Sequence, residues 1–322
     1  MIVSIKKILK TSIPLIFGAV LVWYSLSKIS INVLIGYFKE ANYEWIFLGL
    51  FFGILSHLSR AYRWKFMLDP LGFKPRFTNS VLAVLIGYFV NLAIPRAGEV
   101  SRATVMANYE NIPFEKAFGT IVAERVADLI ILLLIIGVAF FFQTELISSF
   151  IFKENESSSI YYKIFVFVVL PLVGLFTYRL LKKSKNPFIK SIITFVNGLI
   201  DGAKSIFTMK KKWKFIFHTI FIWGMYVLMF YVVTFALPET TNLPFAAIIV
   251  GFVVGGLSMA LTNGGLGTYP LLVAGALVLY KIEHNPALAF GWIMWTAQTL
   301  MVILFGSLSL ILIPIYNKYQ EK

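Results

Sequence analysis

The sequence has no cysteine and few charged residues: of its 322 residues, 14% are charged and 59% are hydrophobic. Without cysteine there can be no disulfide, no thiolate metal site and no cysteine nucleophile. The histidines His57, His218 and His284 are too far apart in the sequence to form a metal-ligand spacing. We therefore expect neither a metal nor a cofactor.

The shortage of charge also argues against a soluble enzyme. Soluble proteins carry about 25% charged residues, and a soluble fold of this length could not bury so much apolar surface. The solvent around the chain must therefore be lipid. The net charge of +14 lies in loops beside apolar runs, which is typical of loops facing an anionic membrane leaflet. We expect no nucleic-acid partner.

Apolar runs predict an all-α fold, a polytopic bundle of membrane helices. A hydrocarbon core of ~30 Å takes ~20 helical residues. About six runs approach that length: 11–28, 44–64, 118–142, 160–181, 213–237 and 286–314. The first run follows Lys6, Lys7 and Lys10. We expect it to be an uncleaved span, the alternative being a cleaved signal peptide.

Loop charge indicates the orientation of the spans. The loops 60–76 and 179–214 are rich in lysine and arginine, which is typical of the cytoplasmic side. The loops 143–159 and 238–243 are mainly acidic and fit the outer side. We therefore expect a multi-pass protein of a bacterial inner (plasma) membrane with both termini in the cytoplasm.

Two apolar regions, 78–110 and 244–281, are interrupted by polar segments that contain glycine or proline. The orientation of the flanking loops requires each region to cross the membrane an even number of times, and two full spans need ~40 residues. We expect two re-entrant hairpins that enter from opposite faces, which resembles the inverted-repeat plan of secondary transporters. The alternative is two pairs of short, tilted spans.

One further segment, 186–209, is moderately apolar with scattered lysines. We expect an amphipathic helix on the inner membrane surface, the alternative being a connecting helix packed on the bundle. Together these elements would form a single transmembrane domain, 1–322.

The tip of the first hairpin has the motif Asn91-x3-Pro95-Arg96-Ala97-Gly98-Glu99-x2-Arg102. An ionised group at membrane depth costs at least ~2.5–3.5 kcal/mol, so such groups persist where they pair or bind a ligand. Pro95 and Gly98 break the helix, and the N-terminus of a new helix favours anions. We expect Arg96 and Arg102 to hold a phosphate and Glu99 to pair with Arg102. The alternative is a self-neutralising cluster that fixes the break.

A second group of charges, Glu124, Arg125 and Asp128, lies near the start of the run 118–142. Glu124 and Asp128 are four residues apart and share one helix face. We expect the group to bind substrate and, if it lies deep, to join a network with Arg96 or Arg102. The alternative is an interfacial cluster in headgroup water.

The tip of the second hairpin is rich in glycine, with Asn263, Gly264, Gly265 and Gly267. Glycine-rich backbone at membrane depth lets N–H groups approach a ligand closely, so we expect these residues to line the substrate path. No Lys-Ser/Thr pair follows the glycines, so this is not a nucleotide-binding loop.

A basic-aromatic group, Arg60, Arg63 and Trp64, ends the second predicted span. One interpretation is an anchor at the inner membrane surface. The other is a patch that collects lipid headgroups at the mouth of the first hairpin.

These motifs resemble the lysylphosphatidylglycerol synthase transmembrane-region family, also called the flippase-like domain family, in order and spacing over nearly the whole chain. The resemblance rests on Asn91 to Arg102, Glu124-Arg125-x2-Asp128, Gly264-Gly265-x-Gly267 and Arg60-x3-Trp64. It implies a lipid-handling membrane domain, which in bifunctional members moves an aminoacylated phospholipid made by a separate soluble domain.

Only a short tail follows Ile313, so we expect a stand-alone member without the synthase domain and without lysyl transferase activity. Many members have a glutamate soon after the glycine motif, where this chain has Thr268-Tyr269-Pro270. This departure puts the substrate or the energy coupling in question.

We expect a flippase or transporter that handles the polar or anionic headgroup of a membrane phospholipid or other polar lipid, and not an enzyme. Two alternatives stay open. One is a membrane enzyme acting on a polyprenyl-phosphate or glycolipid. The other is a non-catalytic partner of a cell-envelope lipid synthase. The sequence also leaves room for a homo-oligomer.

Overall fold

A computed structural model describes residues 18–143, 169–182 and 186–318. Within these ranges every regular element is helical, which confirms the all-α class. Several predictions fall wholly or partly outside the described residues. These are the N-terminal lysines Lys6, Lys7 and Lys10, the first part of the span 11–28, nearly all of the outer loop 143–159, the first part of the span 160–181, residues 183–185 of the basic loop 179–214, and the C-terminal end after residue 318.

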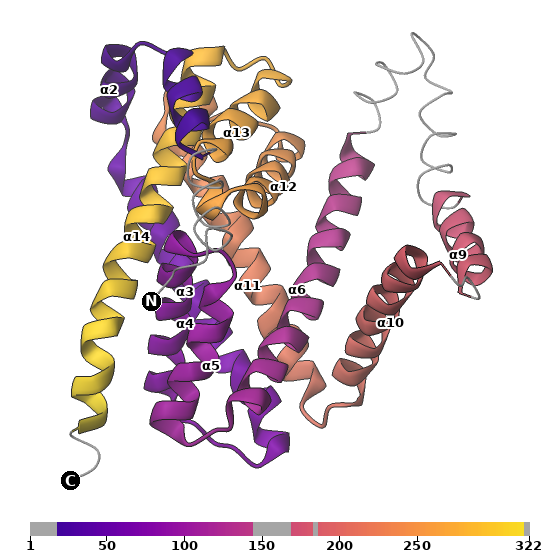
Figure 1. The fold of residues 1–322 in the computed structure, drawn as a ribbon. Helices are drawn as coiled ribbons and strands as arrows, with labels where there is room; N and C mark the ends of the chain where they lie inside the picture. Colours follow the sequence, from indigo (N-terminus) through magenta and orange to yellow (C-terminus); the bar gives the residue numbers. More distant parts are fainter. Residues whose placement is uncertain (1–17, 144–168, 183–185, 319–322) are drawn as a thin grey trace, which may run out of the picture. The chain divides into compact units, whose positions relative to one another are not determined.

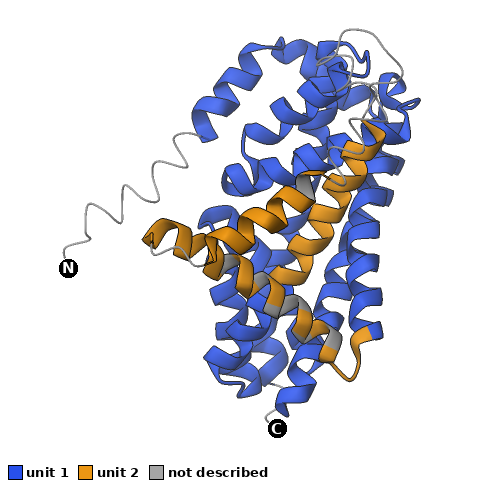
Figure 2. Ribbon diagram, turned by 90° about the vertical axis from the view of Figure 1, so that its right-hand side faces the viewer, with its two compact units in different colours: residues 1–124, 213–322 blue, residues 125–212 orange. Residues whose placement is uncertain are grey.

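The chain divides into two compact units (Figure 2), one of residues 1–124 and 213–322 and one of residues 125–212. The boundary falls inside helix α6 (Phe114–Phe142), whose first residues belong to the first unit. The prediction of a single domain concerns the whole chain and stays a prediction.

Within the described ranges, four helices are long and apolar enough to cross a membrane, and they match four of the predicted spans. They are α3 (Tyr43–Leu68), α6, α11 (Lys212–Val233) and α14 (His284–Lys318). A fifth candidate differs from the straight span predicted at 11–28. There the helix Gly18–Ser27 is followed by α2 (Ile31–Glu40), with an 88° bend between them. Helix α9 (Leu170–Leu181) is the described part of the predicted span 160–181.

The first interrupted region forms a hairpin of α4 (Phe77–Ala93) and α5 (Ala97–Glu110), which pack against each other. At ~1.5 Å per residue the arms are about 26 and 21 Å long, too short to cross a ~30 Å core. The arms approach closely because both contain glycine at their contact. A Cβ added to Gly87 would lie 3.0 Å from the carbonyl oxygen of Gly98.

The second interrupted region forms a second hairpin, made of α12 (Phe245–Leu261), the 3-10 turn η5 (Asn263–Gly265) and α13 (Thr268–Val278). Its tip reverses through Gly264, Gly265 and Gly267, whose φ angles are 59°, 74° and 73°. Glycine adopts this left-handed region without steric cost, which explains three glycines in five residues.

Helix α14 runs along both hairpins (Figure 1). Near its start Gly291 lies against Pro270 of α13, and past its middle Gly306 lies against Phe89 of α4. Its C-terminal end meets the base of the first hairpin, where Asn317 and Asn79 exchange hydrogen bonds of 2.9 and 3.0 Å. The two hairpins therefore enter from opposite ends of α14, as predicted.

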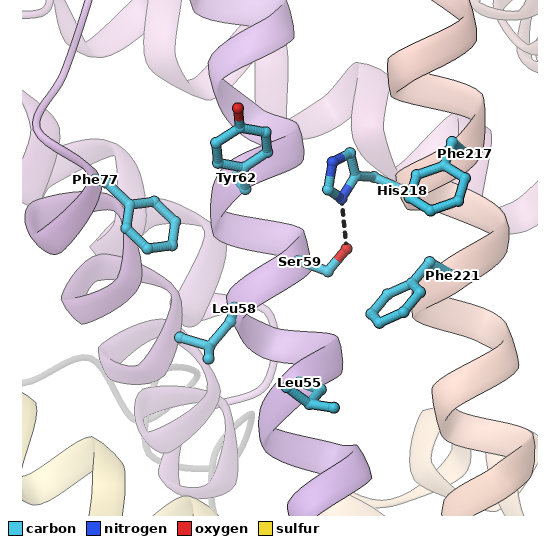
Figure 3. Close-up of a pocket in the computed structure, with 8 residues that line it drawn as sticks. All are labelled: Leu55, Leu58, Ser59, Tyr62, Phe77, Phe217, His218 and Phe221. Atoms are coloured by element: carbon cyan, nitrogen blue, oxygen red, sulfur yellow. Dashed lines mark hydrogen bonds between the residues drawn. The ribbon is translucent and has the colours of Figure 1, made fainter.

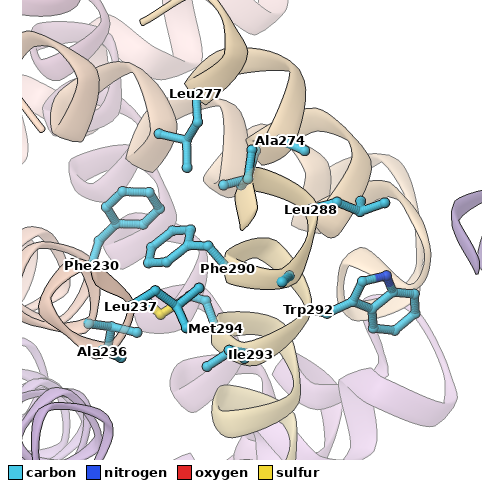
Figure 4. Close-up of a cluster of buried hydrophobic side chains, with 14 of the residues drawn as sticks. Phe230, Ala236, Leu237, Ala274, Leu277, Leu288, Phe290, Trp292, Ile293 and Met294 are labelled. Atoms are coloured by element: carbon cyan, nitrogen blue, oxygen red, sulfur yellow. The ribbon is translucent and has the colours of Figure 1, made fainter. Parts of the chain in front are cut away.

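The base of the second hairpin contains a large apolar core (Figure 4). Phe230 of α11 packs edge-on against Phe290 of α14, with ring centroids 5.4 Å apart. Leu277 of α13 and Leu237 complete the cluster as fully buried side chains. This core fixes α13 on α14 and thereby sets the position of the glycine-rich tip.

The predicted amphipathic segment 186–209 forms helix α10 (Pro187–Thr208), whose N-terminus is capped by the side chain of Asn186. Proline in the first turn and an Asn cap are favourable helix starts. The helix is therefore present, and its position on the membrane surface stays a prediction.

We predict that Gly306→Ala destabilises the fold, because the added Cβ would lie within 3.0 Å of the Leu85 carbonyl oxygen and collide with Phe89. Overpacking of this kind costs about 1–3 kcal/mol. Thermal unfolding in detergent should show a lowered midpoint. Gly275→Ala in α13 is the control, because its Cβ would meet no atom within 4 Å. Equal midpoints for the two variants would contradict the close packing of α14 on α4.

Candidate functional site

The tips of the two hairpins meet inside the first unit. A Cβ added to Gly264 would lie 2.6 Å from Cδ2 of Leu92, near the end of α4. The indole N–H of Trp295, on α14, donates to the carbonyl oxygen of Gly264 at 2.7 Å. Trp295 and Gly306 lie on either side of the midpoint of α14, which spans His284–Lys318. The tips therefore meet at the middle of the longest helix.

The first tip is organised by Asn91. Its side-chain oxygen accepts a hydrogen bond from the backbone N–H of Gly98 at 2.7 Å, and its amide nitrogen lies 3.5 Å from Oε2 of Glu99. This N–H is one of the donors that the start of a helix leaves without an intrahelical partner. The side chain of Asn91 thus accepts a hydrogen bond from the Gly98 N–H, which is one of the backbone donors that were expected to favour an anion.

Arg96 stands at the turn between the two arms. It has a left-handed backbone with φ of 63°, which is rare outside glycine. The side chain is exposed, and among the described residues it makes no hydrogen bond or ion pair. The turn leaves this guanidinium exposed at the tip of the first hairpin.

Deeper in the hairpin, Glu124 of α6 is shared by two arginines. Nη1 of Arg102, on α5, lies 3.0 Å from its Oε2, and Nη2 of Arg63, on α3, lies 3.5 Å from its Oε1. All three side chains are at most 3% exposed. This confirms the interaction that we expected between Glu124 and Arg102 if Glu124 lay deep. The predicted Glu99–Arg102 pair stays a prediction.

Aromatic and hydroxyl side chains surround this ion network. The guanidinium carbon of Arg102 lies 4.3 Å from the ring centroid of Trp64, whose indole N–H donates to Oγ1 of Thr120 at 2.8 Å. Arg63 donates to Oγ1 of Thr219 at 2.9 Å and lies over the ring of Phe215 at 5.2 Å. Stacking and charge-assisted hydrogen bonds compensate the arginines for lost hydration.

The basic-aromatic group therefore differs from the exposed patch that one interpretation required. Arg60 is 3% exposed, and Arg63 and Trp64 are fully buried. Helix α3 turns these side chains toward the interior of the unit, where Arg60 lies beside the hydroxyl of Tyr226. Their predicted role in collecting headgroups stays untested, but in this conformation they are not at the surface.

Arg125 and Asp128 belong to the second unit. Nη1 of Arg125 lies 3.6 Å from Oδ2 of Asp128, one helical turn away. Arg125 is 39% exposed and Asp128 is 8% exposed. The three charges predicted as one group are thus Glu124 in the first unit and an i, i+3 pair in the second.

In the second tip, Asn263 is 8% exposed, and within the described ranges its side-chain nitrogen has no hydrogen-bond partner. A hydrogen bond of 2.7 Å between the hydroxyls of Thr262 and Thr268 closes the loop around it. A buried donor without an acceptor is unfavourable by about 1–3 kcal/mol, so it marks a place where a ligand or water acceptor would be stabilised.

Sequence reasoning missed Thr120, Thr219, Phe215 and Trp295, which hold the network and the tip in place. A buried arginine signals that partners must exist on other helices. It does not indicate which threonine or aromatic ring they are, because Thr219 lies 156 residues from Arg63 and Thr120 lies 56 residues from Trp64.

The family described as "Lysylphosphatidylglycerol synthase TM region" matches residues 12–306. The UPF0104 membrane protein MJ1595 of Methanocaldococcus jannaschii is 25% identical over 341 aligned positions, which cover 95% of this chain and 96% of that protein. No solved structure matches the chain.

We predict that Glu124→Gln lowers stability by about 3–5 kcal/mol, because it removes one partner of a buried ion pair and leaves the other charges buried. Thermal or denaturant unfolding in detergent would measure the loss. Glu115→Gln is the control, since Glu115 is exposed on the first turn of the same helix. If both variants were as stable as the parent protein, the network would not hold α3, α5 and α6 together.

Proposed function

The chain belongs to the lysylphosphatidylglycerol synthase transmembrane-region family, and we propose that it binds the phosphate of an anionic membrane lipid between its hairpin tips and moves that lipid across the bilayer. The family and the apolar helices make the chain a multi-pass membrane protein with a lipid-related role. Binding of a lipid headgroup and transport of the lipid are the parts of the function that we propose here.

Depth in the membrane supports this proposal. Helix α14 has 35 residues, which is about 52 Å at ~1.5 Å per residue, so it crosses the bilayer with a margin at each end. A structure centred on its midpoint lies near the bilayer middle. The two tips meet at that level, because Trp295 holds Gly264 and Gly306 holds Phe89. Transporters commonly bind substrate at such a position, between broken helices.

The observation that carries the proposal is Arg96, an exposed guanidinium at this level without a partner among the described residues. A charge at mid-depth costs at least ~2.5–3.5 kcal/mol unless an opposite charge or water compensates it. A lipid phosphate is the anion most abundant in a membrane, and arginine binds phosphate through two parallel hydrogen bonds. The left-handed turn directs the side chain outward, so a headgroup could reach it while its acyl chains stay in lipid.

Two further features support an anion at the tips. The side-chain nitrogen of Asn263 is a buried donor that lacks an acceptor within the described ranges. Gly264 of the second tip is half-buried and has no side chain of its own, so a headgroup could approach its backbone. The network of Arg63, Arg102 and Glu124 would hold the first hairpin rigid while the lipid passes.

The same proposal includes an orientation. The base of the first hairpin and the basic loop 60–76 would face the cytoplasm, and both termini would lie on that side of a bacterial inner membrane. The second hairpin would then enter from the outer side.

The proposal predicts that Arg96→Gln slows lipid movement. The test uses proteoliposomes that contain phosphatidylglycerol with a fluorescent acyl chain, and it follows quenching of the outer-leaflet dye. We expect a rate at least about tenfold lower than that of the parent protein, since charge-assisted hydrogen bonds contribute about 1.5–3 kcal/mol. Arg96→Lys should keep part of the activity, because it retains the charge and loses the paired geometry.

Lys39→Gln is the matched control, because Lys39 is an exposed lysine at the end of α2, far along the chain from both tips. It should leave the rate unchanged. Normal thermal stability of Arg96→Gln would show that the variant is folded. An unchanged transport rate in a folded Arg96→Gln protein would overturn the proposed role of the tips.

A further inference from the structure

A groove opens on the surface of the first unit between α3 and α11 (Figure 3). Leu55, Leu58 and Tyr62 line it from α3, and Phe217 and Phe221 line it from α11. Tyr62 is 42% exposed and Phe217 is 61% exposed. The groove is thus apolar and open to the medium around the helices, which for these helices is lipid.

The volume of the groove limits what it can hold. It is about 270 Å³, below the roughly 300–1,000 Å³ of a pocket that takes a drug-sized molecule. It therefore suits one segment of a hydrocarbon chain rather than an entire lipid.

One polar pair interrupts the apolar lining. The hydroxyl of Ser59 and Nδ1 of His218 are 2.8 Å apart. The second ring nitrogen of His218 lies on the side of Tyr62 (Figure 3), and among the described residues it has no hydrogen-bond partner. A polar pair of side chains within an apolar groove favours a ligand that has a polar group partway along an apolar chain.

Two lysines stand one helical turn beyond the lining, at one end of the groove. Lys65 follows Tyr62 by three residues near the end of α3, and Lys214 precedes His218 by four residues near the start of α11. Residues at these spacings share a helix face. Both lysines are exposed, and neither pairs with a described residue.

We propose that this groove is a second lipid site, which holds one acyl chain of an anionic phospholipid while Lys65 and Lys214 bind its phosphate. The charge and the shape indicate the same occupant, because the exposed cations Lys65 and Lys214 lie at the end of the groove where α3 ends and α11 begins. Ser59 is six residues before Lys65, about 9 Å along the helix, so His218 would face the ester groups below the phosphate. The site does not depend on transport at the tips.

The test uses the full-length protein in lipid nanodiscs that contain phosphatidylglycerol with a photoreactive group in the acyl chain. After irradiation, mass spectrometry locates the labelled peptides. We expect labelling at Leu58 and Phe217 by phosphatidylglycerol to exceed that by phosphatidylcholine with the same chain by about tenfold. Both lipids carry a phosphate, but the choline cancels its charge, so two lysines attract the net negative phosphatidylglycerol more strongly. The double variant Lys65→Gln/Lys214→Gln should remove the difference between the two lipids.

Three comparisons make the result decisive. Leu58→Trp should fill the groove and lower labelling by both lipids. Lys39→Gln should change nothing. The lipid-facing surface at Leu308 of α14, which is 43% exposed, supplies the level of labelling by ordinary boundary lipid.

Several outcomes would overturn the proposal. One is labelling of the groove no stronger than that at Leu308, which would mean boundary lipid only. Another is unchanged lipid preference in the double lysine variant. A cross-link to a second copy of the chain would make the groove a protein interface. Arg96→Gln should leave the labelling intact, so loss of transport in that variant and loss of the groove site are separate results.

Discussion

A single buried carboxylate, that of Glu124, joins three helices by pairing with two arginines. Arg63 comes from α3 and Arg102 from α5, and both are buried with it. In lipid these charges cannot be hydrated, so each must stay beside its partner for the helices to remain stable. The short arm α5 cannot cross the membrane by itself, and this network holds it against helices that can.

Helix α14 applies a second constraint, because each hairpin packs on it through a glycine. Gly291 admits the backbone at Pro270, and Gly306 admits Phe89. Without water to drive association, membrane helices rely on such close packing. As a result, the two hairpins start at opposite ends of α14, and their tips are in contact near the middle of that helix. An irregular backbone at that depth is stable only inside the protein or beside a polar path, which is the basis of the proposed transport site.

The two proposed lipid sites would recognise a lipid phosphate at different depths in the membrane and with different side chains. At the tips, an arginine held outward by a left-handed turn would recognise a phosphate at mid-depth. At the α3–α11 groove, lysines near the helix ends would recognise a phosphate at its usual depth in the membrane, and apolar walls would hold a chain. The second arrangement requires no desolvation of charge, so its lipid would exchange more easily.

The sequence by itself determined the membrane class, the all-α fold, four straight spans and both hairpins, because hydrophobic length and loop charge act locally along the chain. It also indicated Asn91, Arg96 and Arg102 as one group and Glu124 as part of a second group that would join the first if it lay deep. The bend after Ser27, helix α2 and the inward position of Arg63 and Trp64 came only from the tertiary structure. So did the choice of Glu124 as the partner of Arg102, since pairing between distant helices depends on how they pack, and no local pattern encodes that contact.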